Sequence, residues 1–154
     1  MKIILGVDGS PCSAAAVEFV KRMAWPTGSR VEVIRAVPPV LVAIPEAYLL
    51  LSDRLDDLRN DLLVEAQKYV EDVSCELLGR GLTIDARLIE DDPREALVEA
   101  ARASGADLLV VGSHGRSGLS KLFIGSVSSH VVTHAPCSVL VVREERPVAS
   151  VPSH

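Results

Sequence analysis

The sequence predicts an α/β fold: a single domain built on an open, five-stranded parallel sheet with helices on both faces. Short segments rich in β-branched residues alternate with longer amphipathic segments along the chain, and strands separated by helices pair in parallel through right-handed crossovers. The length of 154 residues suits one domain, because domains commonly hold about 100–200 residues. Neither an internal repeat nor a Gly/Ser-rich linker divides the chain.

Five segments are predicted strands because they are short, rich in β-branched residues and bounded by Gly, Pro, Asp or Ser. They cover residues 2–7, 31–37, 83–89, 107–112 and 138–142. The first and the fourth are almost continuously apolar, which is typical of central strands covered on both faces. The third alternates apolar and polar side chains, so we expect it to be more exposed.

Four segments carry apolar residues at helical spacing and are predicted helices. They cover residues 13–25, about 53–78, 93–104 and 126–135. Start and stop signals flank them, namely Ser10-Pro11, Gly79 and Gly81, Asp92-Pro93 and Gly105, and Pro136. The long second helix opens with acidic residues that the helix dipole favours, and we expect these to form a solvated face: Asp53, Asp56, Asp57 and Asp61.

Two segments fall outside this pattern. Residues 38–51 combine three prolines with many apolar side chains, and they are predicted to be an irregular connection, either a loop packed over the sheet or a lid or partner surface. Residues 144–154 are polar and contain proline, so we expect a flexible C-terminal tail. The domain then spans residues 1–143.

Charge and hydropathy exclude several classes of protein. The chain has 16 basic and 21 acidic side chains and a net charge of −5, whereas nucleic-acid binding normally leaves a basic footprint. The first residues run straight into a strand pattern without a signal-peptide core, and no apolar run reaches the ~20 residues that cross a bilayer. The sequence therefore predicts a cytoplasmic protein with neither nucleic acid nor membrane as partner.

The cysteines and histidines do not form a known ligand pattern. The three cysteines are widely spaced and make no CxxC pair, so we expect free, buried or half-buried thiols rather than a disulfide framework. His130 and His134 are four residues apart on a predicted helix, but no HExxH motif accompanies them. A zinc site is not predicted there.

The most informative stretch is GSHGRSGLSKLFIGS, residues 112–126, which contains four glycines directly after a predicted buried strand. It leaves the carboxyl end of the fourth strand, as Asp8-Gly9-Ser10 leaves that of the first, and ligands of open parallel sheets bind at that edge. Glycines lack the Cβ atoms that hold a ligand away, and they permit positive φ, so that N–H groups converge on an anion.

The same stretch ends at Gly125-Ser126, which opens the last helix, and the free N–H groups of a helix start favour a phosphate. Neither GxxxxGK[ST] nor GxGxxG is present. The residues alone therefore predict a pocket for a phosphorylated small molecule; a flexible glycine-rich connection is the alternative. Arg116 and Lys121 belong to this stretch. Either they neutralise phosphate charge, or one or both of them point into solvent.

The spacing Gly112-x2-Gly115-x9-Gly125-Ser126 resembles the G-x2-G-x9-G-[S/T] signature of the ATP-binding branch of the universal stress protein family. The flanking sequences DLLVVGSHGRSGLSKLFIGSVSSHVVTHAPCSVLVV and IILGVDGS resemble the C-terminal half and the opening strand of that family. The resemblance covers roughly residues 1–143. It implies a Rossmann-like sheet of five parallel strands with helices on both faces.

The resemblance also implies a set of nucleotide-binding residues. Gly6 and Asp8 would line the adenosine side, the backbone near Val37 would meet the adenine, and Gly112 would approach the ribose. One group of residues would wrap the phosphates: Ser113, His114, Gly115, Arg116, Ser117 and Gly118. A second group would contact the phosphates from the start of the last helix: Gly125, Ser126 and Val127. Three roles stay open for Asp8: acceptor for the nucleotide, which we favour, metal ligand, or cap of the first helix.

Partners and activity follow from the same resemblance. The ligand would be ATP or another adenine nucleotide, with Mg²⁺ carried by the phosphates. Members commonly dimerise through the last strand, residues 137–142, which begins at Cys137 and ends at Val142 and whose free edge is otherwise a liability.

We predict a nucleotide-responsive dimeric sensor of the stress response that acts on an unidentified protein partner. A slow ATPase or phosphotransferase is the alternative, although no second acidic or water-orienting residue for turnover is visible. A dimerisation module without nucleotide is the second alternative. Ser113-His114 is not expected to form a catalytic dyad, because adjacent side chains rarely aim at each other and no GxSxG is present.

Overall fold

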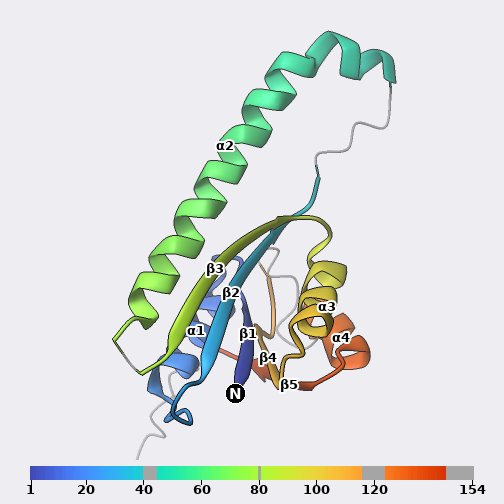
Figure 1. The fold of residues 1–154 in the computed structure, drawn as a ribbon. Helices are drawn as coiled ribbons and strands as arrows, with labels where there is room; N and C mark the ends of the chain where they lie inside the picture. The colour runs from blue at the N-terminus through green and yellow to red at the C-terminus, as the bar shows by residue number, and fades with distance from the viewer. Residues whose placement is uncertain (40–44, 80, 116–123, 145–154) are drawn as a thin grey trace, which may run out of the picture.

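The computed structural model (Figure 1) describes residues 1–39, 45–79, 81–115 and 124–144. Within these described residues, nine elements follow one another, with strands and helices in alternation. They are β1 (Lys2–Gly6), α1 (Pro11–Arg22), β2 (Arg30–Val37), α2 (Pro45–Leu77), β3 (Thr83–Glu90), α3 (Pro93–Ser104), β4 (Leu108–Gly112), α4 (Ser126–His134) and β5 (Ser138–Val142).

The five strands form one parallel sheet in the order β3-β2-β1-β4-β5, which confirms the predicted fold class. Leu5 of β1 lies opposite Val33 of β2 and Val110 of β4. The chain builds the sheet outward from β1 to β3 and then returns to the other side of β1 for β4. The strand order thus reverses between β1 and β4, where open sheets bind ligands.

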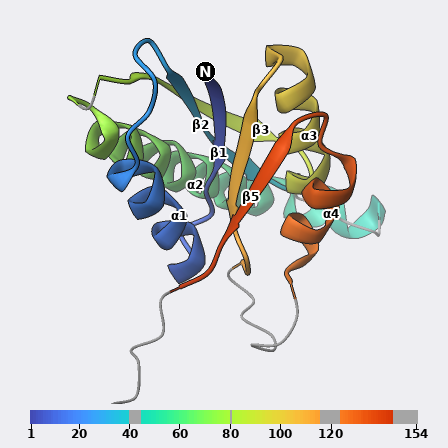
Figure 2. The same ribbon diagram turned by 90° about the horizontal axis from the view of Figure 1, so that it is seen from below.

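Helices cover both faces of the sheet. Figures 1 and 2 show α1 and α2 on one face and α3 and α4 on the other. Each layer encloses an apolar cluster; Leu5 and Val33 belong to the first, and Ile4 and Ile34 to the second. Successive strand residues thus enter opposite cores, and each fully buried Leu or Ile contributes about 1.5–3 kcal/mol.

The exposure of the strands also agrees with the sequence. The almost continuously apolar strands, β1 and β4, are interior strands of the sheet, whereas the alternating strand β3 is an edge strand with largely exposed side chains. An apolar run is stable where helices cover both faces, and an alternating strand tolerates an edge.

The helix ends carry the predicted caps. Ser10 caps α1 by accepting a hydrogen bond from the Ser13 N–H, and Pro11 occupies the first turn. Asp92 caps α3, where the adjacent Arg94 guanidinium lowers the pKa of its carboxyl from 3.8 to about 2. Gly105 ends α3 in the left-handed conformation (φ 60°), which glycine adopts without a Cβ penalty.

Helix α2 begins earlier than predicted. It starts at Pro45 and runs for 33 residues, so the interpretation of residues 45–51 as irregular connection was wrong; residues 40–44 lie outside the described part. Proline is favoured in a first helical turn, and the following residues are good helix formers. The N-terminal part of α2 projects beyond the sheet (Figure 1). The acidic residues therefore lie after its first turn, and Asp56, Asp57 and Asp61 are exposed as expected.

All three cysteines are free. Cys12 and Cys137 are half-buried as predicted, but Cys75 is exposed, which corrects the expectation for that residue. Val73 and Leu77 of α2 face the core, and Cys75 between them falls on the outer face of the helix. Among the described residues, none of the helices combines the length and apolar character needed to cross a bilayer.

Candidate functional site

A pocket of about 620 Å³ opens at the carboxyl edge of the sheet, at the point where the strand order reverses. The ends of β1, β2 and β4 form its floor, and residues of α2, α3 and α4 complete its walls. The volume suits a small molecule of nucleotide size. The position predicted from the topology and the position of the pocket therefore coincide.

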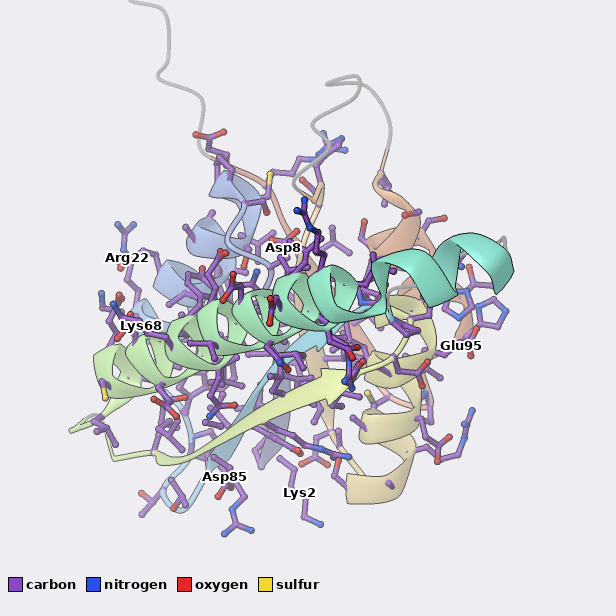
Figure 3. All side chains as sticks on the ribbon, turned by 90° about the horizontal axis from the view of Figure 1, so that it is seen from above. Lys2, Asp8, Arg22, Lys68, Asp85 and Glu95 are labelled. Carbon is purple, nitrogen blue, oxygen red and sulfur yellow. The ribbon has the colours of Figure 1, made fainter. Side chains whose placement is uncertain are left out.

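The turn after β1 is held rigid by its own side chains. Asp8 Oδ1 accepts a hydrogen bond from the Ser10 N–H (2.9 Å), and the Asp8 N–H donates to Ser13 Oγ (3.1 Å). Gly9 between them has φ 81°, a conformation that favours glycine. Because Ser10 is the cap of α1, the cap role considered for Asp8 is excluded. Asp8 Oδ2 accepts no hydrogen bond from another described residue, and Asp8 lines the pocket. Figure 3 shows Asp8 beside α2, away from Lys2 and Asp85.

The same turn is tied to the glycine-rich segment after β4. Ser10 Oγ donates to the carbonyl oxygen of His114 (3.1 Å) while it accepts from the Ser13 N–H. On the other side, the Ser113 carbonyl accepts from the Gly125 N–H (2.7 Å) and from Ser128 Oγ (3.0 Å). The two loops that flank the switch point thus form one hydrogen-bonded unit.

The glycines of the motif have different roles. A Cβ on Gly112 would lie 2.6 Å from the Cys12 carbonyl carbon and 2.7 Å from the Ser13 nitrogen, so the protein backbone, not a ligand, requires glycine there. A Cβ on Gly115 would meet Asp8 Oδ2 at 3.0 Å. Neither glycine has positive φ, so neither uses the left-handed conformation that glycine permits; Gly118 lies outside the described residues.

Helix α4 presents an open N-terminus to the pocket. Its cap residue is Gly125, and no side chain in the described part of the chain forms a cap hydrogen bond there. Gly125, Ser126 and Val127 all line the pocket. The N–H groups of a first helical turn that lack a cap carry a partial positive charge and hold anions.

Ser113 and His114 contact each other, contrary to expectation. Ser113 Oγ lies 3.0 Å from His114 Nδ1. Ser113 is 1% exposed and does not line the pocket, however, whereas His114 does. The contact therefore orients the imidazole ring and does not present a serine nucleophile to a ligand.

The opposite wall of the pocket contains a buried cation that the sequence analysis missed. Arg35 of β2 is 7% exposed and lines the pocket. Its guanidinium carbon lies 5.3 Å from the centre of the Tyr69 ring, and its Nη2 lies 4.0 Å from Glu65 Oε1. Both partners belong to α2, which also contributes Leu62 to this wall.

Nine of the thirteen residues named from the sequence line the pocket: Gly6, Asp8, Val37, Gly112, His114, Gly115, Gly125, Ser126 and Val127. Ser113 lies behind the lining and supports it through its carbonyl oxygen. Arg116, Ser117 and Gly118 lie outside the described residues, as does Lys121.

Comparison with known proteins assigns the chain to a family. The model of the universal stress protein family matches residues 1–143. The chain belongs to the universal stress protein family. A universal stress protein of Thermus aquaticus is 35% identical over 143 residues, which cover 92% of this chain and 97% of the relative.

Two solved structures extend the comparison. MJ0577, a universal stress protein of Methanocaldococcus jannaschii, is similar with a TM-score of 0.79 and 25% identity, over 95% of this chain and 97% of that protein. A universal stress protein in complex with cAMP is similar with a TM-score of 0.62 and 26% identity, over 94% and 98% of the two chains. These likenesses support the assignment to the ATP-binding branch that the glycine signature indicated.

The two histidines of α4 are not accompanied by a ligand set. The rings of His130 and His134 stack with centroids 4.1 Å apart, and His130 Nε2 lies 3.2 Å from Glu95 Oε1. That contact does not have hydrogen-bond geometry. Among the described residues of this universal stress protein, no three His, Cys, Asp or Glu side chains gather into a metal site.

Sequence reasoning missed residues that reach the pocket from other elements. Leu62 and Leu97 come from helices, and Pro38 and Pro39 from the end of β2. For Arg35 a signal was present, because Val31, Val33, Arg35 and Val37 alternate on one face of the strand. A charge among three valines marks either an edge or a site, and β2 is an interior strand.

Proposed function

We propose that this universal stress protein binds ATP in the pocket at the carboxyl edge of its sheet and acts as a nucleotide-responsive dimeric sensor. One observation carries the proposal: the open N-terminus of α4 faces a pocket of about 620 Å³. Phosphate oxygens satisfy such N–H groups, and each charge-assisted hydrogen bond contributes about 1.5–3 kcal/mol.

The nucleoside half then lies toward β1 and β2. Gly6, Val37 and Leu97 provide apolar contact there, and Asp8 Oδ2 is available to accept a hydrogen bond from a ribose hydroxyl. The family relative bound to cAMP supports an adenine nucleotide as the ligand class. Asp8 is the one carboxylate in the described pocket lining, so Mg²⁺ would arrive coordinated by the phosphates rather than by a protein cage.

The dimer would form through β5. This strand is an edge of the sheet, with β4 as its partner, and an unpaired edge favours association with another strand. Sedimentation velocity at increasing protein concentration should show a dimer, and the amides of β5 that do not donate to β4 should become protected from hydrogen exchange only in that dimer. A monomer at every concentration would exclude this part of the proposal.

The sensing step would use the hydrogen-bonded unit of the two loops. Ser10 joins the Asp8 turn to the His114 carbonyl, so a ligand that moves one loop moves the other. A protein partner would recognise the difference. Three free cysteines suit the reducing cytoplasm, where we place the protein.

The decisive experiment measures how much the α4 N–H groups contribute to binding, apart from the other residues of the pocket. Ser126→Pro removes one N–H from the helix start, yet proline is tolerated there, and the preceding Gly125 is already extended (φ −63°, ψ 160°). Ser126→Ala removes only the hydroxyl and is the matched control. Titration calorimetry with Mg-ATP should show about tenfold or greater weakening for Ser126→Pro and a smaller change for Ser126→Ala.

Calorimetry needs protein without bound ligand. The purified protein is therefore denatured first and any released molecule identified by mass, and ADP formation is followed during the titration. Binding without product supports a sensor, and steady product formation makes the protein an ATPase or phosphotransferase. A folded parent that binds no adenine nucleotide would overturn the proposal and leave the dimerisation module.

A further inference from the structure

We infer that Arg35 is a specificity-determining residue of the pocket, whose guanidinium donates hydrogen bonds to acceptor atoms on the nucleoside half of the ligand. This inference rests on the proposed function and deepens it. Nothing in the glycine signature involves β2, and the sequence analysis assigned no cation to this wall of the pocket.

Burying the charge of Arg35 carries a free-energy cost. The Arg35 side chain is 8% exposed, and it donates no hydrogen bond to any residue in the described part of the chain. Burial of an ionised group without hydrogen bonds is strongly unfavourable. The contacts with Glu65 at 4.0 Å and with the Tyr69 ring offset part of that cost. Its five N–H donors have no hydrogen-bond acceptor among the described residues, so they are available to water or to a ligand that enters the pocket.

The guanidinium of Arg35 is accessible from the pocket. Arg35 lines the pocket. Some buried side-chain nitrogens lack both a hydrogen-bond partner and contact with water, but none of them belongs to the Arg35 guanidinium. The Tyr69 ring holds the guanidinium from the side of α2. Tyr69 itself packs toward the turn after β1, because its Cζ lies 3.9 Å from the position of a Cβ on Gly9. The cation is thus fixed beside the Asp8 turn.

The strand order puts Arg35 at the nucleoside end of the pocket. The strand order β2-β1-β4 separates its strand from β4 by two strand spacings, about 10 Å. Tyr69 belongs to α2, and α2 and α4 cover opposite faces of the sheet (Figure 2). Phosphates at the α4 N-terminus therefore lie across the pocket from Arg35. The atoms within its reach are ribose oxygens and purine ring nitrogens, which accept hydrogen bonds from a planar guanidinium.

The test compares ligands that share the nucleoside and differ in phosphate number. Adenosine, AMP and Mg-ATP are titrated into the nucleotide-free parent and into Arg35→Met, which keeps the length of the side chain and removes its donors. We expect the affinity for all three ligands to fall by the same factor, about tenfold to a hundredfold. Arg35→Lys keeps the charge without the planar fork and should restore part of the affinity.

Arg30→Met is the matched control, because Arg30 lies at the opposite end of the same strand and is exposed beside Asp85. It should bind all three ligands like the parent. Thermal unfolding of Arg35→Met reports separately on structure. Its midpoint should not fall, because a buried apolar side chain of similar length avoids the cost of removing the guanidinium charge from water.

Each result leads to a definite conclusion. An equal loss for adenosine and ATP in Arg35→Met, with Arg30→Met unchanged, supports the inference. A loss that grows with the number of phosphates would place Arg35 at the phosphates and overturn it. Parent-like affinity in Arg35→Met would also overturn it while leaving nucleotide binding intact. Failure of the parent to bind any of the three ligands would instead refute the proposed function.

Discussion

The two walls of the pocket are built in different ways. The wall of β4 and α4 offers backbone groups: an uncapped helix start and a loop held by the Ser113 and His114 carbonyls. The wall of β2 and α2 offers side chains, with Arg35 held against Tyr69. Backbone N–H groups suit any phosphate, whereas a buried guanidinium discriminates between acceptors. In the proposed function, the first wall would therefore provide affinity for a class of ligands, and the second would provide selectivity within it.

The largest effect on stability is expected from Gly112→Ala. The added Cβ would overlap the backbone of α1 at Cys12 and Ser13, at 2.6 and 2.7 Å, and backbone cannot rotate away as a side chain can. We expect a loss of about 3 kcal/mol in the free energy of unfolding, measured by urea denaturation. Stability equal to that of the parent would show that Gly112 serves the ligand, as the sequence first indicated.

Gly115→Ala should show the reverse pattern. Its Cβ would meet a side-chain oxygen, Asp8 Oδ2, at 3.0 Å, and that carboxylate can shift. We expect a change in stability within about 0.5 kcal/mol but about tenfold weaker Mg-ATP binding, because Asp8 is displaced from its position in the pocket. Calorimetry measures the change in Mg-ATP binding, and urea denaturation of the same preparation measures the change in stability. A stability loss as large as that of Gly112→Ala would remove the distinction between the two glycines.

A smaller effect is expected where the two loops are joined. Ser10→Ala removes the cap of α1 and the hydrogen bond to the His114 carbonyl, and loss of a serine cap costs about 1 kcal/mol. Ser129→Ala is the control, because Ser129 is an exposed residue of α4 that does not line the pocket. Urea denaturation should separate the two variants, and equal stability would argue against a structural tie at Ser10.

The smallest effect concerns the attachment of α2. Arg59 of α2 forms a bidentate ion pair with Glu90 at the end of β3 and lowers the pKa of that carboxyl from 4.5. A lowered pKa stabilises the fold at pH values above 4.5, and this contribution is lost as the pH falls through the lowered value. As the pH falls from about 6 to about 3, the unfolding midpoint of the parent should therefore decrease more than that of Glu90→Gln. Parallel curves would show that the ion pair does not hold α2.

The sequence predicted what depends on local patterns. Strand periodicity separated interior β1 and β4 from edge strand β3, and the caps at Ser10 and Asp92 were identified because capping depends on neighbouring residues. The glycine spacing located the wall of β4 and α4. Each of these features is a property of a few consecutive residues.

The remainder depends on tertiary contacts that no local pattern contains. Gly112 is needed because α1 crosses its strand end, and that crossing is absent from the sequence of the motif. Arg35 becomes a pocket residue only when α2 brings Tyr69 over β2. The early start of α2 at Pro45 was missed because three prolines suggested a loop, although a proline also suits a first helical turn.

The most direct test of nucleotide binding is the change in backbone amide chemical shifts when Mg-ATP is added to the nucleotide-free protein. The amides of Ser126 and Val127 should shift most and saturate with the ligand, because they would donate to phosphate oxygens; the amide of Arg30 at the far end of β2 should not move. Shifts that leave the start of α4 unchanged, or that never saturate, would contradict a phosphate site at this helix.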